Sequence, residues 1–547
     1  MTNSPYQMRA SNLGQRPTVC LIVPPSAFLL DERVFMSLGL LKVAAVCEQA
    51  GFPVEVLDLS GVENYMDALD AQLESSQATY YGVTSTTPQM PSATAILERI
   101  RSVRPDARTI LGGPHPTLVF AARRREVKLQ LPGRGTKSFE HLTELADTVV
   151  CGDGEEAIFL ALSPNAPAVI DADDPKGDLF LTRQQLEQLP LAARHLVDIS
   201  SYNYEIDGYR ATSLIAQLGC PFACGFCGGR ESAMLRRPRL RATEGVIREL
   251  EHLHTEYGFR GFMFYDDELN VNPQIVELMQ EITALQKRHN TDFRLRGFVK
   301  SELFTEEQAA AMYEAGFRWI LVGFESGSPR ILTNINKKAT REDNSRCVEI
   351  AHKHGLKVKA LMSVGHPGES QETIQQTRDW LLEAQPDDFD VTIITTYPGT
   401  PYFDRAEPAP FIDNVWVYTY PKTGDKLYAE ELDYTTTADY YKGDPNGGYR
   451  SFVFTDYLSQ DDLVRLRDKT EREVREQLDI PFNPSAAKVF FEHSMGASGP
   501  LPPSILRKSS GATAKGVTAT NETAEATPHV VPAPRIAEPE APKTVVE

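Results

Sequence analysis

Short runs of β-branched and other apolar residues alternate with amphipathic stretches twice along this chain of 547 residues. This alternation limits the possible folds more than any other feature, because it predicts strand–helix–strand units and therefore parallel sheets. The first array extends from Pro17 to about Leu160, and the second from Thr212 to about Thr395. A chain of this length exceeds one ordinary core, so we expect two or three domains of the α/β class.

The first array predicts a doubly wound, flavodoxin-like (Rossmann-like) domain over residues 17–162. Buried parallel strands are expected at residues 19–23, 54–57, 80–84, 109–111 and 148–150. In such sheets ligands bind at the carboxyl ends of the strands. Between Ala121 and His141 the pattern is broken by Arg123–Arg125 and Gly133–Gly135, which predicts a surface loop.

The second array predicts six further strands, at residues 212–218, 261–265, 293–298, 319–324, 358–363 and 390–395. Helices are expected between them, for example at residues 243–257, 305–315, 341–354 and 372–384. Six strand–helix units are too few for a closed eight-fold barrel, so we predict a partial, open (β/α)6 barrel over residues 206–403.

The remaining segments connect or follow these two domains. We predict a flexible N-terminus over residues 1–16, a linker over 163–205 and a small α+β cap over 404–495 that ends in a charged helix from Gln460 to Leu478. Past Gly496 the chain is rich in Ala, Pro, Thr and Glu, which predicts a disordered tail over residues 496–547.

Composition and charge exclude several classes of function. The formal net charge of −19 argues against nucleic acid as a partner, because phosphate binding depends on Lys and Arg. No apolar run approaches the roughly 18–20 residues that a membrane-spanning helix needs, and residues 1–15 lack the apolar core of a secretory signal. Seven cysteines without a disulfide-like arrangement favour the reducing cytoplasm.

Three of the seven cysteines, Cys220, Cys224 and Cys227, are spaced C-x-x-x-C-x-x-C directly after the first predicted strand of the second array. An electron-carrying [4Fe–4S] cluster normally takes four protein thiolates. Three thiolates on one loop leave one iron open to a small molecule, as catalytic metal sites generally require. The alternatives are a zinc knuckle or chance clustering, and zinc needs a fourth Cys or His at matching spacing. The cysteine run therefore predicts a [4Fe–4S] cluster with an open iron.

This loop resembles the signature of the radical S-adenosylmethionine superfamily, in which the open iron binds the amino and carboxylate groups of S-adenosylmethionine. Further segments strengthen the resemblance. Tyr265-Asp266-Asp267-Glu268 occupies the place where the family binds the amino group, which needs acceptors because an ammonium only donates. The alternative for these residues is an acidic loop or a helix cap. Arg296 is a candidate for the carboxylate of the cofactor, although strand-face arginines are usually solvated.

The segments after the later strands also match the superfamily. Residues 323–328 resemble the ribose-contacting segment, which implies roles for Glu325 and Ser326. Residues 364–369 resemble the adenine-side motif, which implies a close backbone approach at Gly365. Thr396-Tyr397-Pro398-Gly399-Thr400-Pro401 matches the turn after the sixth strand.

Four segments of the first array, residues 37–41, 83–88, 111–116 and 151–155, resemble the cobalamin-binding domain of cobalamin-dependent radical S-adenosylmethionine enzymes of the class B methyltransferase type. Each segment alone is also compatible with an ordinary strand–helix turn. The resemblance implies cobalamin contacts from Ser85, Thr86, Thr87, Gly112, Gly113, Gly152 and Glu155, with His115 in the same neighbourhood.

One departure concerns the lower face of cobalamin. Cobalamin-dependent mutases carry D-x-H-x-x-G, whose histidine ligates cobalt, whereas here the first strand is followed by Pro24-Pro25-Ser26-Ala27. We therefore expect no histidine ligand from this position, and His115 is not assigned as a cobalt ligand. A weakly ligated cobalt favours the cob(I) state, which suits methyl transfer.

The resemblance implies a cobalamin-dependent radical S-adenosylmethionine methyltransferase. One S-adenosylmethionine would methylate cob(I)alamin, and a second would be cleaved at the cluster to give a radical that activates an unactivated carbon for methylation by methylcobalamin. Two alternatives remain open at this stage. The first is a non-methylating enzyme with the same cofactors, such as an oxidative cyclase of tetrapyrrole chemistry. The second is a non-catalytic cobalamin sensor.

The expected partners are a small organic substrate and an external one-electron reductant of the flavodoxin or ferredoxin type. Secondary-metabolite biosynthesis, such as that of an antibiotic, is the expected setting. Tyrosines become frequent after residue 417, namely at positions 418, 420, 428, 434, 440, 441, 449 and 457. They predict either substrate contacts or simple packing of the cap, and the sequence does not distinguish these.

Overall fold

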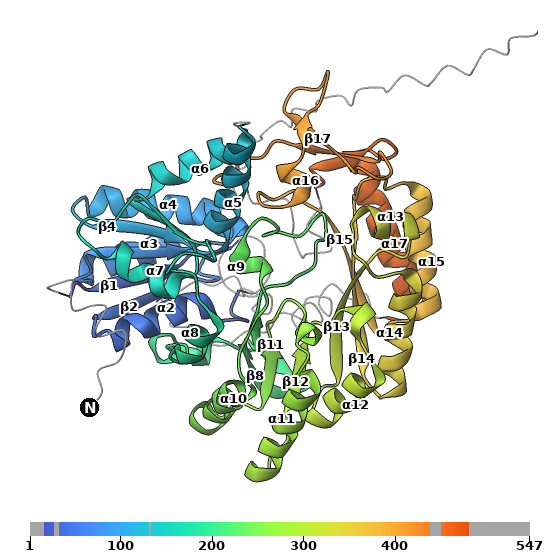
Figure 1. Ribbon diagram of the computed structural model, residues 1–547, viewed down its shortest axis with the longest axis horizontal. Coiled ribbons are helices and arrows are strands. Elements are labelled where there is room, and N and C mark those ends of the chain that lie inside the picture. Colours follow the sequence, from blue (N-terminus) through green and yellow to red (C-terminus); the bar gives the residue numbers. More distant parts are fainter. Residues whose placement is uncertain (1–15, 27–31, 131–132, 438–449, 481–547) are drawn as a thin grey trace, which may run out of the picture. The chain divides into compact units, whose positions relative to one another are not determined.

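The first array forms one six-stranded parallel sheet in a computed structural model that describes residues 16–26, 32–130, 133–437 and 450–480 (Figure 1). The strand order β2-β1-β3-β4-β5-β6 contains the flavodoxin-like order expected from the sequence. The strands are β1 (Val19–Val23), β2 (Val54–Asp58), β3 (Tyr80–Thr84), β4 (Arg108–Gly112), β5 (Thr148–Gly152) and β6 (Val169–Ala172).

Helices cover both faces of this sheet because its strands are apolar on both sides. Val19, Leu21 and Val23 of β1 face α2 (Leu38–Gln49) and α7 (Gly154–Ala161). Cys20 and Ile22 face the opposite side. There they share a core with α3 (Tyr65–Ser75), α4 (Met90–Val103), α5 (Pro114–Leu129) and α6 (Arg134–Leu145).

Two features of this domain differ from the sequence-based prediction. The strand β6 lies inside the predicted linker, where it pairs in parallel with β5. The predicted surface loop over residues 121–141 is wrong, since this segment consists mainly of helices α5 and α6. The glycines that suggested a loop mark the start of α6, where the Glu126 carboxylate accepts hydrogen bonds from the backbone N–H groups of Gly133, Gly135 and Thr136 at 3.1, 2.9 and 2.7 Å.

The second array forms the predicted partial barrel. Its six parallel strands are β8 (Tyr209–Leu214), β11 (Gly261–Phe264), β12 (Arg294–Gly297), β13 (Trp319–Glu325), β14 (Lys357–Val364) and β15 (Asp388–Ile393). Isolated bridges pair Leu295 with Phe317 and Phe298 with Leu321, and they join the two halves of the barrel between β12 and β13. A short strand, β7 (Glu205–Ile206), pairs antiparallel with β8.

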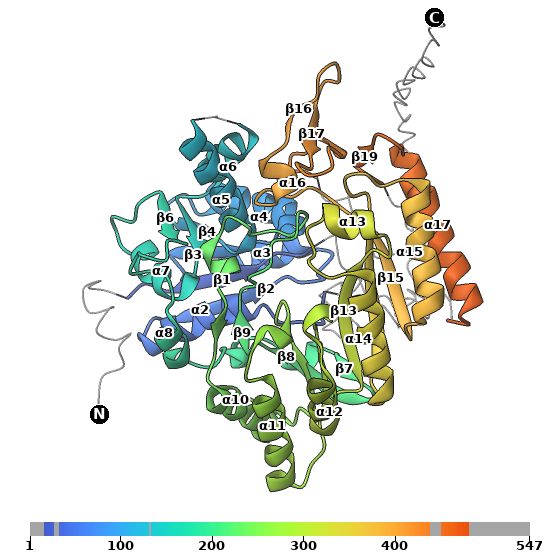
Figure 2. The same cartoon turned by 45° about the vertical axis from the view of Figure 1, so that its right-hand side comes forward.

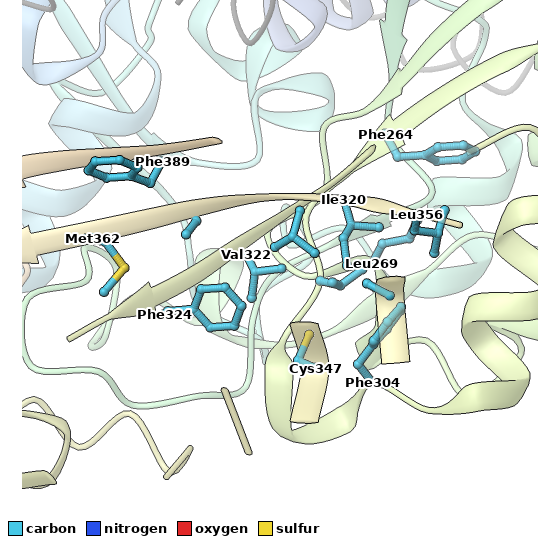
Figure 3. Close-up of a cluster of buried hydrophobic side chains, with 14 of the residues drawn as sticks. Phe264, Leu269, Phe304, Ile320, Val322, Phe324, Cys347, Leu356, Met362 and Phe389 are labelled. Carbon is cyan, nitrogen blue, oxygen red and sulfur yellow. The ribbon is translucent and has the colours of Figure 1, made fainter. Parts of the chain in front are cut away.

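The outer face of these strands packs on a layer of helices. The helices are α10 (Thr243–Tyr257), α11 (Ile275–His289), α12 (Glu306–Ala315), α14 (Arg341–Lys353) and α15 (Gln371–Ala384). Figure 3 shows part of this core, in which Ile320, Val322 and Phe324 of β13 alternate along the strand and point to one side. Cys347 of α14 lies in the same apolar cluster, fully buried. The outer face is thus a packed core, which leaves the inner face and the strand ends for function.

The C-terminal part contains a small antiparallel sheet and one long helix. The sheet has the order β16 (Glu407–Pro408), β17 (Val415–Thr419), β18 (Lys426–Glu430) and β19 (Val453–Thr455). The helix α17 (Gln460–Gln477), close to the predicted 460–478, lies beside α15 in both views (Figures 1 and 2). Tyr440, Tyr441, Tyr449, the N-terminal residues 1–15 and the predicted tail at 496–547 lie outside the described residues. None of the described helices is long and apolar enough to cross a membrane.

Candidate active site at the strand ends

The cysteine loop, residues 219–228, follows β8 and the short strand β9 (Gln217–Leu218) at the carboxyl end of the barrel. Its backbone is fixed by side chains, because the carbonyl oxygens of residues 221–223 accept hydrogen bonds from Arg230, Arg236 and Asn336. In addition, the Cys220 N–H donates to the Leu235 carbonyl at 3.0 Å. The loop is therefore held in one conformation by the protein itself.

Two glycines allow this loop to pack closely on its surroundings. At Gly225 a Cβ atom would lie 2.5 Å from the ring of Tyr402, which is buried. At Gly219 the φ angle is +79°, a conformation that L side chains rarely adopt. Phe226 of the loop packs against His366, with 5.3 Å between the ring centroids.

The three thiols differ in exposure: Cys224 is buried, Cys220 is half-buried and Cys227 is exposed. Burial raises the pKa of the Cys220 thiol to about 11, and nearby acidic groups and Cys224 add to this shift. Burial also raises the pKa of Cys224, against the effect of the ammonium groups of Lys337 and Lys300. Metal ligation requires thiolates. Because the pKa values of these thiols are raised, the thiols keep their protons until a cationic iron core binds and displaces them.

In the described part of the chain no three His, Cys, Asp or Glu side chains form a group that could hold one metal ion. The three thiols of the loop nevertheless lie within electrostatic range of one another. A cubane takes its thiolates on separate iron atoms, so its ligands need not converge on one point. The donor set, three thiols beside two ammonium groups, fits a [4Fe–4S] cluster.

The acidic segment after β11 divides into residues with different surroundings. The Asp266 carboxylate is buried and accepts hydrogen bonds from the backbone N–H groups of Ala216, at 3.1 Å, and Gln217. Asp267 is exposed. Glu268 carries a buried carboxylate oxygen, Oε2, that has no hydrogen-bond partner among the described residues.

Burial raises the pKa of Glu268 to about 7, whereas Lys337 and Lys300 act to lower it. An orphaned buried carboxylate oxygen close to the cluster loop fits a ligand ammonium group, which would supply the missing donors. Asp266, in contrast, already uses its carboxylate to hold the chain before the cluster loop.

The half-buried Glu325 begins a chain of hydrogen bonds on the inner side of the barrel. Its carboxylate accepts from Lys337 Nζ at 3.0 Å and from Ser363 Oγ at 2.8 Å. Ser363 Oγ in turn lies 2.8 Å from His366 Nε2, and His366 Nδ1 lies 3.4 Å from the Tyr402 hydroxyl. Burial lowers the pKa of His366 to about 4, so its ring is neutral at physiological pH.

Ser326 and Gly365 have structural partners within the protein. The Ser326 hydroxyl lies 2.9 Å from the hydroxyl of Thr377. Gly365 has a φ angle of +94°, and its N–H donates to a Glu369 carboxylate oxygen at 3.2 Å. These contacts shape the turns after β13 and β14, where Glu325 and its partners are presented.

The strand ends of the first sheet bring together Ser85, Thr87 and His115. The backbone N–H of His115 donates to the Ser85 carbonyl at 2.9 Å, and its Nδ1 lies 3.0 Å from the Thr87 hydroxyl. The Ser85 hydroxyl donates to the Thr86 carbonyl. Thr86 is exposed at this edge. Desolvation lowers the pKa of His115 to about 3, so the imidazole is neutral.

The glycines at these strand ends have two different roles. Gly113 and Gly152 are required by the protein's own packing, because a Cβ would lie 2.7 Å from the Thr84 hydroxyl and 2.3 Å from the Ala172 carbonyl carbon, respectively. Gly39, at the start of α2, has no atom within 4 Å of the Cβ position, and Gly112 has none closer than 3.8 Å. Gly39 is exposed, and Gly112 and Glu155 are half-buried, so a ligand can approach the backbone closely at both glycines, which fits a bulky group such as cobalamin.

The two sets of strand ends meet through α5. Leu118, one turn into α5, lies 3.3 Å from the Cβ position of Gly228, which follows the last cysteine of the cluster loop. The same side chain lies 3.0 Å from the Cβ position of Gly399 in the turn after β15. The His115 ring also lies 6.3 Å from the ring of Tyr434, whose hydroxyl donates to the Thr396 carbonyl. The first sheet thus presents its ligand edge to the cluster loop.

Several residues of this site are not apparent in the sequence. Lys300 and Lys337 come from separate loops, and the Lys300 ammonium group lies 4.3 Å above the Phe222 ring of the cluster loop. Arg230, Arg236 and Asn336 hold that loop, although no motif marks them. The only signal in the sequence is that some of these polar residues lie a few positions from a motif. Such neighbours are common in any sequence, so they do not identify the residues of a site.

Two sequence-family models match the chain. The model of the Radical SAM superfamily matches residues 214–381, and that of the B12 binding domain matches residues 32–143. These matches agree with the three-cysteine loop at the barrel and with the ligand edge of the first sheet, and together they decide the family. The chain is a cobalamin-dependent radical S-adenosylmethionine enzyme. Its cofactors are a [4Fe–4S] cluster, S-adenosylmethionine and cobalamin.

Similar proteins extend these matches over most of the enzyme. An uncharacterized methyltransferase of Pyrococcus horikoshii is 26% identical over 394 residues, covering 71% of this chain and 83% of the relative. An anaerobic magnesium-protoporphyrin IX monomethyl ester cyclase of Cereibacter sphaeroides is also 26% identical, covering 65% of this chain and 57% of the cyclase.

A solved structure shares the fold of the enzyme. The radical S-adenosylmethionine methyltransferase TsrM from Kitasatospora setae, with cobalamin and a [4Fe–4S] cluster bound, superposes with a TM-score of 0.55 at 19% identity. The match covers 74% of this chain and 81% of TsrM. The two chains therefore share one fold over most of their length.

Proposed function

We propose that the enzyme transfers a methyl group from S-adenosylmethionine, by way of cobalamin, to an unactivated carbon of a small organic substrate. One observation carries the proposal: α5, which begins beside His115 at the cobalamin edge, contacts both the cluster loop and the turn after β15 through Leu118. A methyl group held at the first site would then lie close to a substrate carbon activated at the second. The methyltransferase names of the Pyrococcus and Kitasatospora relatives support this reading.

When bound, the cluster supplies one electron for cleavage of S-adenosylmethionine, and cobalamin supplies a carrier for the methyl group. The protein's own part is to hold and orient. Cys220, Cys224 and Cys227 provide the thiolates. Glu268 accepts the ligand ammonium group, and Glu325, fixed by Lys337 and Ser363, presents a carboxylate for hydroxyl groups.

His115 keeps the cobalamin edge uncharged. Since desolvation holds its pKa near 3, the ring stays neutral and remains paired with the Thr87 hydroxyl through the physiological range. This neutral pair orients the start of α5 without placing a cation beside the cobalamin edge.

An anaerobic assay of the full chain with methyl-labelled S-adenosylmethionine and a strong reductant tests the proposal. We expect two coproducts, 5′-deoxyadenosine and S-adenosylhomocysteine, and label in a methylated small molecule. The similarity to the cyclase favours a second candidate, radical chemistry without methylation. That candidate predicts 5′-deoxyadenosine alone, and such a result would contradict methyl transfer.

The electron donor in this proposal is an external one-electron carrier of the flavodoxin or ferredoxin type. Nucleic acid is not the proposed partner, because the net charge of −19 opposes phosphate binding. The free thiols of all seven cysteines support a reducing, cytoplasmic setting.

A further inference from the structure

Three polar side chains on the inner side of the barrel are buried yet lack a hydrogen-bond partner for one atom among the described residues. They are Ser213 on β8, Arg296 on β12 and Tyr204 just before β7, with exposed fractions of 1%, 6% and 0%. The orphaned atoms are Ser213 Oγ, Arg296 Nε and the Tyr204 hydroxyl. Buried polar atoms are rarely left unpaired in the absence of a ligand or water.

Strand register places two of these side chains in one row. Ser213 pairs with Met263 of β11, and Met263 pairs with Arg296. Leu214, Phe264 and Leu295, which alternate with this row, belong to the outer core packed on the helices. Because side chains alternate along a strand, Ser213, Met263 and Arg296 all face the inside of the barrel, near the carboxyl ends of their strands.

An apolar and aromatic floor lies beside this row. Tyr204 packs with Val34, Ile206, Ala211, Met263 and Leu321 in a separate buried cluster. Phe35 joins it, with ring centroids 5.0 Å from Tyr204 and 4.9 Å from the half-exposed Tyr265. Burial raises the pKa of Tyr204, against the opposing effect of the neighbouring Arg296 guanidinium, so the hydroxyl keeps its proton and can donate it to a ligand.

Arg296 differs from the other buried cations of the barrel, because no carboxylate of the described residues forms an ion pair with it. Other cations of the barrel interior are paired: Lys359 lies 3.1 Å from Asp388 and 2.9 Å from Asp390, and Lys337 lies 3.0 Å from Glu325. An unpaired buried guanidinium is costly. The arrangement therefore suits an anion that arrives with a ligand.

The position of Arg296 argues for the substrate rather than for S-adenosylmethionine. Lys300 and Lys337 are the ammonium groups that act on Cys224 and lie next to the cluster loop. Arg296 lies instead beside Tyr204 and the apolar floor.

We infer that Arg296, together with the Tyr204 hydroxyl, binds a carboxylate on the substrate, and that the substrate carries an apolar or aromatic body against Phe35 and Tyr265. A guanidinium and a carboxylate form paired hydrogen bonds of matching geometry. This inference rests on the proposed function only in naming the bound acid as the substrate to be methylated.

The test measures binding to the full-length, anaerobically reconstituted protein, with no turnover. The probes are indole-3-acetate and its uncharged partner indole-3-acetamide, which differ only in the anionic group. We expect the wild type to bind the acid at least tenfold more tightly than the amide, and Arg296→Met to lose this preference. Arg296→Lys should restore part of it, and Tyr204→Phe should weaken binding of the acid alone.

A matched control separates charge from position. Arg294→Met removes a cation two residues earlier on β12, where Arg294 is already paired with Asp292, and should leave the preference intact. S-adenosylmethionine itself is titrated as a third probe, and Arg296→Met should bind it within twofold of the wild type.

Three results would overturn the inference: equal binding or no binding of acid and amide by the wild type, an acid preference that survives Arg296→Met, or a tenfold loss of S-adenosylmethionine binding in that variant. The last result would place Arg296 on the cofactor. Because no methyl transfer is measured, failure of the methyltransferase assay leaves this test intact.

Discussion

At the scale of single residues, the neighbouring carboxylates of Asp266 and Glu268 have different tasks. Asp266 holds two backbone N–H groups that lead into the cluster loop, whereas Glu268 Oε2 is buried and without a partner. The motif Tyr265–Glu268 identifies the segment from sequence. The division of roles depends on where Ala216 and Gln217 lie in space, fifty and forty-nine residues away along the chain, and so it could not be predicted.

This division predicts opposite phenotypes for two variants. Glu268→Gln should weaken S-adenosylmethionine binding about tenfold, or roughly 1.4 kcal/mol, because a charged acceptor becomes a neutral amide. Asp266→Ala should instead lower the free energy of unfolding by about 1–3 kcal/mol, since two buried N–H groups lose their acceptor. Calorimetric titration and denaturant unfolding give the two quantities. Unchanged affinity in Glu268→Gln would contradict the assigned role.

His115 should make the protein acid-sensitive. Its pKa in the folded state, about 3, lies below the ordinary 6.5, so the unfolded chain binds more protons and stability falls as the pH drops below 6.5. At pH 5 this linkage costs about 2 kcal/mol. The His115→Gln variant can still form a hydrogen bond with Thr87. Between pH 7 and pH 5 its free energy of unfolding, measured with urea, should fall by about 2 kcal/mol less than that of the wild type. His141→Gln, on the exposed side of α6, is the control, and equal pH slopes in the wild type and His115→Gln would refute the burial argument.

At the scale of whole elements, α17 closes the open edge of the barrel. The Glu471 carboxylate accepts from the Val391 N–H at 3.0 Å, and Arg467 Nε donates to the Val391 carbonyl at 2.7 Å. Arg475 donates to Asp388 and to the Phe389 carbonyl of the same strand, β15. Side chains of α17 therefore occupy backbone groups that a seventh barrel strand would otherwise pair.

Removal of Glu471 should therefore destabilise the barrel. Glu471→Ala leaves the Val391 N–H without its acceptor and removes one carboxylate partner from each of the buried Arg467 and Arg475, so we expect a loss of about 3–5 kcal/mol in the free energy of unfolding. Glu476→Ala, exposed on the same helix, should change it by less than about 0.5 kcal/mol. Similar effects of both variants would show that α17 does not protect the strand edge.

The elements with strong periodicity were predictable, and those defined by distant contacts were not. The six barrel strands and α17 follow from apolar alternation within each segment. Strand β6 was missed because Val169–Ala172 is short and gains its identity only by pairing with β5. Helices α5 and α6 were missed because Arg123–Arg125 and Gly133–Gly135 suggest a loop, whereas Glu126 caps α6 and Arg124 pairs with Asp173.

At the scale of the whole molecule, helix α6 of the first domain contacts the segment that follows the barrel. Arg134 donates to the Phe403 carbonyl at 2.9 Å, and its guanidinium lies 3.7 Å from the Phe403 ring centroid and 4.5 Å from that of Trp416. Burial lowers the pKa of Arg134 to about 10, which leaves it charged at neutral pH. This contact helps to keep the two cofactor edges together.

Loss of this contact should loosen the first domain without affecting the cluster loop. Arg134→Ala should reduce stability by about 2 kcal/mol, given a desolvated cation–π contact and one lost hydrogen bond. In calorimetry we expect an earlier first transition while the iron content stays unchanged. Lys137→Ala, exposed on the same helix, should leave the transition in place, and an identical effect of both variants would contradict the contact's role.

The most direct test of the account counts 5′-deoxyadenosine and bound cobalamin in anaerobically reconstituted, reduced Cys224→Ala, with Cys347→Ala, a buried cysteine of the barrel's outer core, as control. If the loop thiols hold the iron–sulfur cluster beside a separate cobalamin domain, Cys224→Ala should form no 5′-deoxyadenosine and still bind cobalamin as the wild type does. Wild-type cleavage of S-adenosylmethionine by Cys224→Ala would contradict it.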